Sequence, residues 1–158
     1  MSAVAYRLVK KRHAKEAFSG EGARIAGGRW NSPGIGVVYV SETLSLAALE
    51  TFVHLQPVDR HYDYVWFRIA ISKDVSIDSV ATLPTSWRRK PPTDATQAIG
   101  TRWVQASRTA VLRVPSILVP GEYNFLLNPT HPNFKRLKIS RAATFDFDAR
   151  LWKGGVDK

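Results

Sequence analysis

The stretch from Gly20 to Gly36 constrains the fold of this chain most strongly, because it contains six glycines together with Pro33. This composition disfavours regular structure and predicts a long loop, and a loop of this length inside a compact domain is often functional. Residues 37–40 are β-branched and aromatic, which predicts a buried strand directly after the loop. The sequence therefore places a functional loop next to the core.

An apolar helix is predicted after this strand, from about Leu44 to Leu55. Ser41 or Thr43 can cap its N-terminus, and Pro57 ends it. Apolar side chains form two adjoining stripes at helical spacing, and one acid, Glu50, lies in the second stripe. If that face packs inward, Glu50 must be hydrogen-bonded, salt-bridged or functional, since acids are rarely buried unpaired; otherwise it lies on an exposed rim.

The whole chain predicts an α+β fold in a single domain over residues 1–158, with small mixed β-sheets and two or three helices. Residues 73–92 are expected to be mostly irregular, because they are polar and hold three prolines. Further strands are expected over residues 6–9, 62–71, 111–112, 116–119, 137–139 and 144–148. Further helices are expected over residues 13–18 and from 93 or 94 to 108.

The net charge of +10, from 23 Lys and Arg against 13 Asp and Glu, implies an anionic partner or substrate. Nucleic acid, a nucleotide and an acidic protein all satisfy this charge. No apolar run reaches the roughly 18 residues of a membrane span, and the N-terminus lacks a signal-peptide pattern, so we expect a cytoplasmic protein. The absence of cysteine excludes disulfides, a thiol nucleophile and thiolate metal ligands.

Two motifs for other binding sites fail on inspection. The run that begins Gly20-Glu21-Gly22 is similar to a dinucleotide-binding signature, but its sixth position is Ile25 and no strand precedes it. The four histidines show no recognised metal-ligand spacing, and we expect no metal. His54 follows Glu50 by one turn, so a hydrogen bond between these two side chains is available, with either a structural or a site-orienting role.

The run Gly27-Gly28-Arg29-Trp30-Asn31 is typical of an anion site. Consecutive glycines allow close backbone approach, so their N–H groups can line an anion cavity. The planar guanidinium of Arg29 matches two phosphate oxygens, although Arg29 can also be a surface turn residue. Trp30 either stacks on a ligand ring or anchors the loop in the core. Ser116 and Asn124, beside an apolar segment, are turn formers when taken alone.

Together, these segments closely resemble the RES-domain toxins of bacterial toxin–antitoxin pairs, a family named for an Arg, a Glu and a Ser. The resemblance extends over the whole chain, and the long glycine-arginine run is its most specific part. The matching pieces are Tyr6-Arg7-Leu8, residues 27–34, Val38-Tyr39-Val40-Ser41, residues 46–50 with His54, Pro115-Ser116, residues 124–132 and residues 145–152.

The resemblance implies a relative of the ADP-ribosyltransferase fold that binds NAD and either degrades it or uses it to modify a protein. It implies Arg29 as the family Arg, Glu50 as its Glu and Ser116 as its Ser, although Ser32 and Ser41 also lie in matching runs. Tyr39 is expected to join these catalytic residues. The residues expected to bind NAD are Arg7, Gly28, Trp30, Asn31 and Asn124.

The residue chemistry agrees with this implication. Loss of nicotinamide from NAD develops positive charge on the ribose, and such a centre needs a nearby carboxylate. Nicotinamide leaves as a neutral molecule, so one carboxylate suffices and no general acid is required. The sequence leaves the acceptor open: water gives a glycohydrolase, phosphate a phosphorylase, and a protein side chain a transferase.

The family implies a cognate antitoxin as partner, and the net charge predicts that it offers acidic side chains or a C-terminal carboxylate to the basic cleft. Two competing interpretations are a basic nucleic-acid-binding module, such as an RNA-cleaving toxin, and a non-enzymatic NAD-binding protein. Nucleic acid is not expected as a direct partner, because aromatic and basic residues do not interleave as in a stacking platform.

Overall fold

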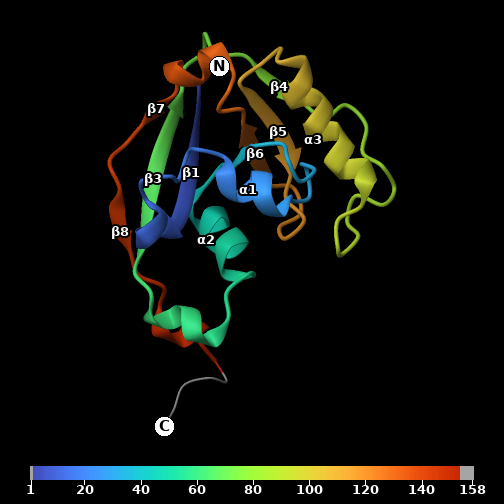
Figure 1. The fold of residues 1–158 in the computed structure, drawn as a ribbon. Coiled ribbons are helices and arrows are strands. Elements are labelled where there is room, and N and C mark those ends of the chain that lie inside the picture. Colours follow the sequence, from blue (N-terminus) through green and yellow to red (C-terminus); the bar gives the residue numbers. More distant parts are fainter. Residues whose placement is uncertain (1, 154–158) are drawn as a thin grey trace.

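The computed structural model describes residues 2–153, and its eight strands form one sheet in the order β4-β5-β6-β2-β1-β3-β7, with β8 paired to β3 (Figure 1). Only the β4–β5 pair is parallel. The strands are β1 Ala3–Lys10, β2 Val38–Ser41, β3 Tyr64–Ile71, β4 Ile77–Ser79, β5 Val111–Pro115, β6 Tyr123–Leu127, β7 Lys138–Ile139 and β8 Ala143–Phe145.

Three α-helices accompany the sheet, which confirms the α+β class; the strands expected in small sheets are joined in one. None of the helices in the described part of the chain is long and apolar enough to cross a membrane. The α-helices are α1 Glu21–Ala26, α2 Leu44–Phe52 and α3 Asp94–Ala106, and the 3-10 helices are η1 Lys11–His13, η2 Pro57–His61, η3 Pro132–Arg136 and η4 Ala149–Leu151.

The central strands β1, β2 and β6 form the part of the sheet on which the helices α1 and α2 lie (Figure 1). β1 pairs with β3 along its whole length, and β2 lies between β1 and β6. Side chains alternate along β2: Val38 and Val40 belong to the main core cluster, whereas Tyr39 and Ser41 are the polar side chains that β2 contributes to a cleft. The short strand β2 therefore connects the core to the site.

Helix α2 begins at Leu44 as expected, because the Thr43 side chain accepts a hydrogen bond from the Leu46 N–H over 3.1 Å. It ends at Phe52 rather than at Leu55, since the chain turns directly after Val53 toward η2. The C-terminal end of the predicted helix was therefore wrong by one turn, while the position of its one acid on the helix was correct.

Two predictions near the N-terminus were wrong. The α-helix expected over residues 13–18 is absent, since His13 ends η1 and residues 14–18 form a bend and turns, and α1 lies inside the stretch from Gly20 to Gly36 that was expected to be a loop. α1 is possible because its glycines lie mainly at its ends: Gly20 and Gly27 take φ values of +76° and +71° there. Between them, an Arg24–Glu21 pair one turn apart supports the helix, with Nε to Oε2 at 2.8 Å.

The segment after β5 also differs from the expectation. Residues 116–119 form bends rather than a strand, because the Ser116 N–H bonds to the Glu122 carbonyl and turns the chain back. The strand that follows, β6, was missed because Asn124 was interpreted as a turn former. Pairing with β2 on one side and β5 on the other overrides that local preference. The strands β3 and β8 are shorter than expected, and β4 lies in the segment expected to be irregular.

Helix α3 matches its predicted range closely and buries Trp103, with Ala98 and Val104 half-buried. Gly100 is the point at which α3 contacts the glycine-rich run. A Cβ built on Gly100 would lie 1.7 Å from the Trp30 carbonyl oxygen, so only glycine permits this backbone contact. Trp30 and Trp103 pack in one buried cluster beside it.

We expect Gly100→Ala to destabilise the protein by about 2 kcal/mol or more, since α3 and the Trp30 backbone must separate. Gly22→Ala is the matched control, because Gly22 is also helical and a Cβ there meets nothing within 4 Å. That control should stabilise by about 0.4–1 kcal/mol. Urea denaturation of both variants measures the difference, and equal effects would contradict the close contact at Gly100.

Candidate active site

A cleft of about 940 Å³ lies over β1, β2 and β6, and both Arg29 and Glu50 line it. Its volume is that of a typical ligand pocket. One wall consists of α1 with the following loop, and another is the inner face of α2. The cleft is completed by Pro115, Ile117 and Leu118 and by the segment that contains Lys90 and Pro92. The two residues that the sequence singled out most strongly therefore face the same space.

Glu50 accepts two hydrogen bonds on the same carboxylate oxygen. The Ser116 hydroxyl donates to Oε1 over 2.8 Å, and Nδ2 of Asn124 donates to Oε1 over 2.7 Å. No residue in the described part of the chain donates to Oε2. The side chain is therefore held in one orientation with its second oxygen available to a ligand, and the alternative of a solvated rim residue is wrong.

Ser116 is itself fixed from behind. It is buried, and its Oγ accepts hydrogen bonds from the N–H groups of Leu118 and Val119 over 3.1 and 3.2 Å. With two donors occupying its lone pairs, the hydroxyl proton points to Glu50. Ser116 does not line the cleft, whereas its neighbours Pro115 and Ile117 do. Its geometry is that of a positioning residue for Glu50.

Asn124 links Glu50 to the central strands. It lies on β6 directly opposite Ser41 of β2, and the Ser41 hydroxyl donates to Oδ1 of Asn124 over 2.6 Å. The amide nitrogen of Asn124 is thereby directed to the carboxylate. Ser41 is therefore linked to Glu50 through Asn124, whereas Ser116 is hydrogen-bonded to Glu50 directly. The third serine in a matching run, Ser32, contacts Thr101 of α3 instead.

Arg29 is held by main-chain carbonyls. Its Nη1 donates to the carbonyl oxygens of Trp87 and Arg89, each over 2.8 Å. Its Nε and Nη2 atoms form no hydrogen bond with the described residues. Burial lowers the pKa of Arg29, while the charges of Glu50 and Tyr39 oppose that shift. The guanidinium is thus anchored at one end and open toward the cleft at the other.

Arg7 is a second cation in the floor of the cleft. Its Nε donates to the Ala17 carbonyl, and its Nη1 donates to the Tyr39 carbonyl over 2.8 Å. Burial lowers the pKa of Arg7 to about 10. No acidic side chain in the described residues forms an ion pair with it, although buried charges are normally paired. This arrangement favours an anionic ligand.

The glycine-rich run supports the cleft differently from what the sequence predicted. The Gly27 N–H bonds to the Ala23 carbonyl and the Gly28 N–H to the Asn31 carbonyl, so neither group lines an anion cavity. Gly28 is required for space, since a Cβ there would lie 2.6 Å from the Tyr39 hydroxyl oxygen. Its expected role in binding the ligand through N–H is corrected to a steric one.

Trp30 and Asn31 are both buried, at 3% and 0% exposure, and anchor the run. Nδ2 of Asn31 donates to the Ala23 and Ile35 carbonyls over 2.8 and 2.9 Å. The Tyr39 hydroxyl donates to Oδ1 of Asn31 over 2.6 Å and accepts from the Trp30 N–H over 3.1 Å. Asn31 is therefore structural, and of the two only Trp30 reaches the cleft wall.

Tyr39 connects the buried residues Trp30 and Asn31 to the cleft. Its hydroxyl is used within the protein, and burial raises its pKa, so it acts as a neutral donor. Its ring lines the cleft. His54 lines the cleft as well but is exposed, and it forms no hydrogen bond with Glu50 in the described structure. The expected Glu50–His54 pair is therefore not formed. No group of three His, Cys, Asp or Glu residues that could hold a metal occurs in residues 2–153.

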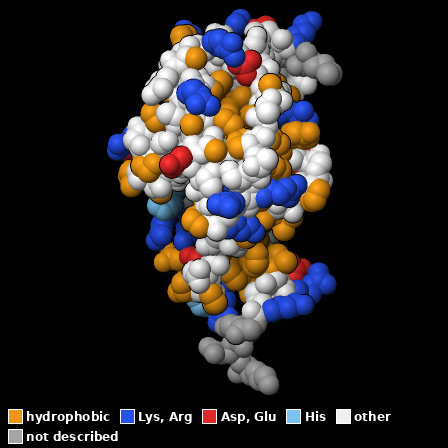
Figure 2. Space-filling model, turned by 90° about the vertical axis from the view of Figure 1, so that its right-hand side faces the viewer, with side chains coloured by type: hydrophobic (Ala, Val, Ile, Leu, Met, Phe, Trp, Pro, Cys, Tyr) orange, Lys and Arg blue, Asp and Glu red, His pale blue; other side chains and the backbone are white. Residues whose placement is uncertain are grey.

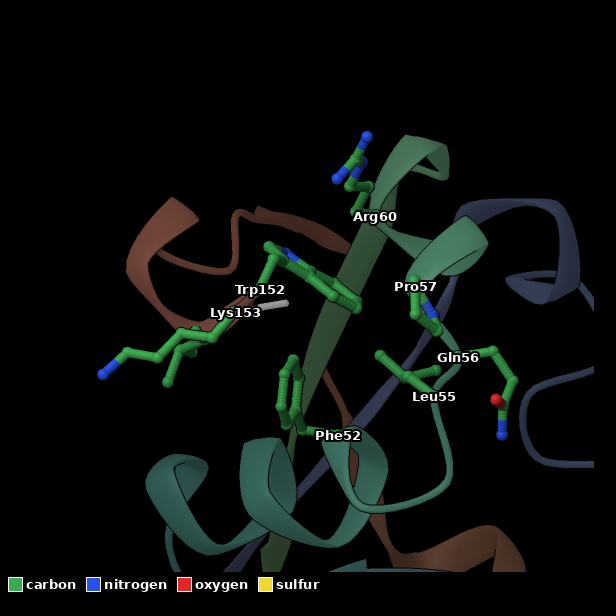
Figure 3. Close-up of a pocket in the computed structure, with 8 residues that line it drawn as sticks. Phe52, Leu55, Gln56, Pro57, Arg60, Trp152 and Lys153 are labelled. Carbon is green, nitrogen blue, oxygen red and sulfur yellow. The ribbon is translucent and has the colours of Figure 1, made fainter. Parts of the chain in front are cut away.

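A second, smaller cavity of about 180 Å³ lies at the C-terminal end of α2, between η2 and η4 (Figure 3). The rings of Phe52 and Trp152 lie beside one another there, with centroids 4.8 Å apart, and Phe147 packs on both. This aromatic cluster braces the helix that carries Glu50. It lies outside the polar network of the cleft.

Three parts of the cleft wall were missed by sequence reasoning: α1, residues 117–118 and the segment with Lys90 and Pro92. The basic residues of the chain form separate groups on the face seen from the α3 side, and no single group dominates it (Figure 2). Charge alone could therefore not identify Lys90. A usable signal was the position of the run Arg88-Arg89-Lys90 between an aromatic residue and two prolines.

Comparisons with known proteins agree with the geometry. A sequence model of the RES domain matches residues 4–148. The chain is 38% identical over 148 residues to a protein of Yersinia enterocolitica named Toxin Res, covering 92% of this chain and 97% of that protein. It is 36% identical over 138 residues to a Sphingobium protein named Prs ADP-ribosylating toxin, covering 85% and 86% of the two chains.

One solved structure shows the same fold. A chain of the MbcT–MbcA toxin–antitoxin complex of M. tuberculosis superposes with a TM-score of 0.73, over 97% of this chain and 88% of that chain. The sequence identity is 19%, so the match speaks for the fold alone.

Proposed function

The chain belongs to the RES domain family of toxins, and we propose that it is the toxin of a toxin–antitoxin pair that cleaves the nicotinamide–ribose bond of NAD. The observation that carries this proposal is that one cleft is lined by a fixed carboxylate, Glu50, and by two cations, Arg29 and Arg7, that form no ion pair with an acidic side chain among the described residues. A dinucleotide that becomes cationic at its ribose needs both kinds of charge.

Glu50 supplies the negative charge. As the bond between nicotinamide and the ribose C1′ breaks, its electron pair leaves with the pyridine nitrogen and the ribose becomes an oxocarbenium ion. Oε2 of Glu50 stabilises this cation or holds the ribose hydroxyls, while the two hydrogen bonds to Oε1 keep the carboxylate in place. Preorganised charge of this kind needs no rearrangement during the reaction.

Arg29 and Arg7 bind the diphosphate. The unoccupied edge of the Arg29 guanidinium presents Nε and Nη2 as a fork for phosphate oxygens. Arg7, whose pKa burial lowers to about 10, regains a favourable environment when a phosphate enters the floor of the cleft. The ring of Tyr39 packs on the ribose or nicotinamide between these charges.

Glu50→Gln should reduce NAD turnover by about 10²–10³, because the charge is lost while the amide oxygen still accepts from Ser116 and Asn124. HPLC of NAD incubated with the purified proteins measures this. Glu16→Gln is the matched control, since it removes an exposed carboxylate at the edge of the same cleft. A Glu50→Gln or Arg29→Ala enzyme within about threefold of wild type would disprove the assignment.

Ser116→Ala should lower kcat by about tenfold or more with little change in KM, because it removes a hydrogen bond to a charged carboxylate that must stay oriented. Ser32→Ala, which affects only the contact with Thr101, should change kcat by less than about twofold. Steady-state kinetics of the two variants tests which serine serves the site. The opposite ranking would assign the family serine to the glycine-rich run.

A second candidate function is transfer of ADP-ribose to a protein, favoured by the name of the Sphingobium relative. Both functions share the bond-breaking step and differ in the acceptor. Product analysis with and without inorganic phosphate separates hydrolysis from phosphorolysis. Transfer of label from NAD to protein in a cell lysate, absent with Glu50→Gln, identifies the transferase.

We also propose that an antitoxin places acidic groups in the same cleft, since the cations there lack acidic partners among the described residues. ADP-ribose should then compete with the antitoxin for binding to the full chain, and raising the salt concentration should weaken the complex. Simultaneous binding of both without mutual effect would place the antitoxin on another surface.

A further inference from the structure

The run Arg88-Arg89-Lys90 contains three consecutive cations that differ in their surroundings. The Arg88 guanidinium stacks on the Trp87 ring, 4.4 Å from its centroid. All three side chains are exposed, and of Arg89 only the carbonyl contacts the site, through Arg29. Lys90 alone among the three lines the cleft. The three cations therefore share solvent exposure and differ in what they contact, and only Lys90 reaches the cleft.

The backbone that carries Lys90 is fixed relative to Arg29. Nη1 of Arg29 joins the carbonyls of Trp87 and Arg89, and Trp87 packs against the buried cluster of Trp30 and Trp103. The Trp87 N–H also bonds to the Pro84 carbonyl over 3.0 Å. One guanidinium therefore contacts the cleft and at the same time positions the next cation on its wall.

We propose that Lys90 is a phosphate-binding residue that, together with Arg29, forms a subsite for the diphosphate of the substrate. This proposal rests on the proposed function, because it names a further contact for the same dinucleotide. No acidic side chain in the described residues forms an ion pair with Lys90. Its flexible stem can place the ammonium on a phosphate oxygen beside the rigid guanidinium fork.

Arg29 and Lys90 contribute differently to the subsite, because one is a fixed guanidinium and the other a flexible ammonium group. Nη1 of Arg29 is already bonded to two carbonyls, so Arg29 has a fixed direction and a limited number of donors left. A diphosphate carries more acceptor oxygens than these donors can satisfy. Lys90 supplies three further donors that adapt to the bound phosphate, and it contributes to substrate binding rather than to bond cleavage.

The test is calorimetric titration of the full chain with ADP-ribose. Lys90→Gln should weaken binding by about fivefold to tenfold, since one charge-assisted contact at a partly exposed site is lost. Arg89→Gln is the matched control: it removes the same charge one residue away and keeps the carbonyl that Arg29 uses. We expect less than about twofold for this control, and Lys90→Arg should restore most of the affinity.

Equal losses of affinity in Lys90→Gln and Arg89→Gln would mean that only the overall positive charge of the segment matters, and this would overturn the proposal. So would an unchanged affinity in Lys90→Gln, or a failure of the wild-type chain to bind ADP-ribose. Adenosine, which lacks phosphate, serves as a second probe, and an equal effect of Lys90→Gln on adenosine would also reject a phosphate contact.

Turnover of NAD by the wild-type chain is measured separately and tests a different statement. If ADP-ribose binding depends on Lys90 but NAD is not consumed, the subsite stands and the proposed cleavage fails. If NAD is consumed and Lys90→Gln changes neither KM nor ADP-ribose affinity, the cleavage stands and the subsite fails.

Discussion

The two hydrogen bonds to Oε1 of Glu50 are the interaction on which the site depends. They join α2 to the bend after β5 and to the central strand β6, which are far apart in the sequence. An acid on a packed helix face is costly unless its lone pairs are satisfied. Here Ser116 and Asn124 satisfy one oxygen completely and leave the other open. The same pair of bonds therefore makes the position tolerable for folding and leaves Oε2 without a hydrogen bond from the described residues.

The glycine-rich run is rigid where its composition predicts freedom. Asn31 has its side-chain amide bonded on both sides, to backbone carbonyls through Nδ2 and to Tyr39 through Oδ1. Gly28 and Gly100 allow contacts that any Cβ would block. Glycine in this run thus permits close packing of a loop against β2 and α3. The result is a fixed direction for Arg29, which a flexible loop could not provide.

The sequence predicted two residues that line the cleft, Arg29 and Glu50, better than it predicted the elements that support them. Glu50 and Arg29 were recognisable because an acid among apolar helix residues and an arginine after two glycines are locally unusual. The strand β6 was hidden because Asn124 has a turn-forming side chain, and only its two partner strands make it extended. α1 was hidden because two of its three glycines, Gly20 and Gly27, cap its ends, which a count of glycines cannot reveal. A short stretch of sequence does not show which distant strand it will pair with, or which glycines will cap a helix.

The two arginines of the cleft are charged groups in unfavourable surroundings when no anion is bound. Arg7 is half-buried with carbonyl partners only, and burial lowers its pKa to about 10, which reports that the charged form is disfavoured there. Burial also lowers the pKa of Arg29, and the charge of Glu50 opposes that shift. An anion that enters the cleft can contact both cations, and its charge offsets the unfavourable effect of burial on them. This attraction applies to any anion in the cleft, whether a substrate diphosphate or a partner's carboxylate. Because such a ligand binds the folded state, it should also stabilise the fold. The substrate and an acidic inhibitor are therefore expected to share one set of contacts.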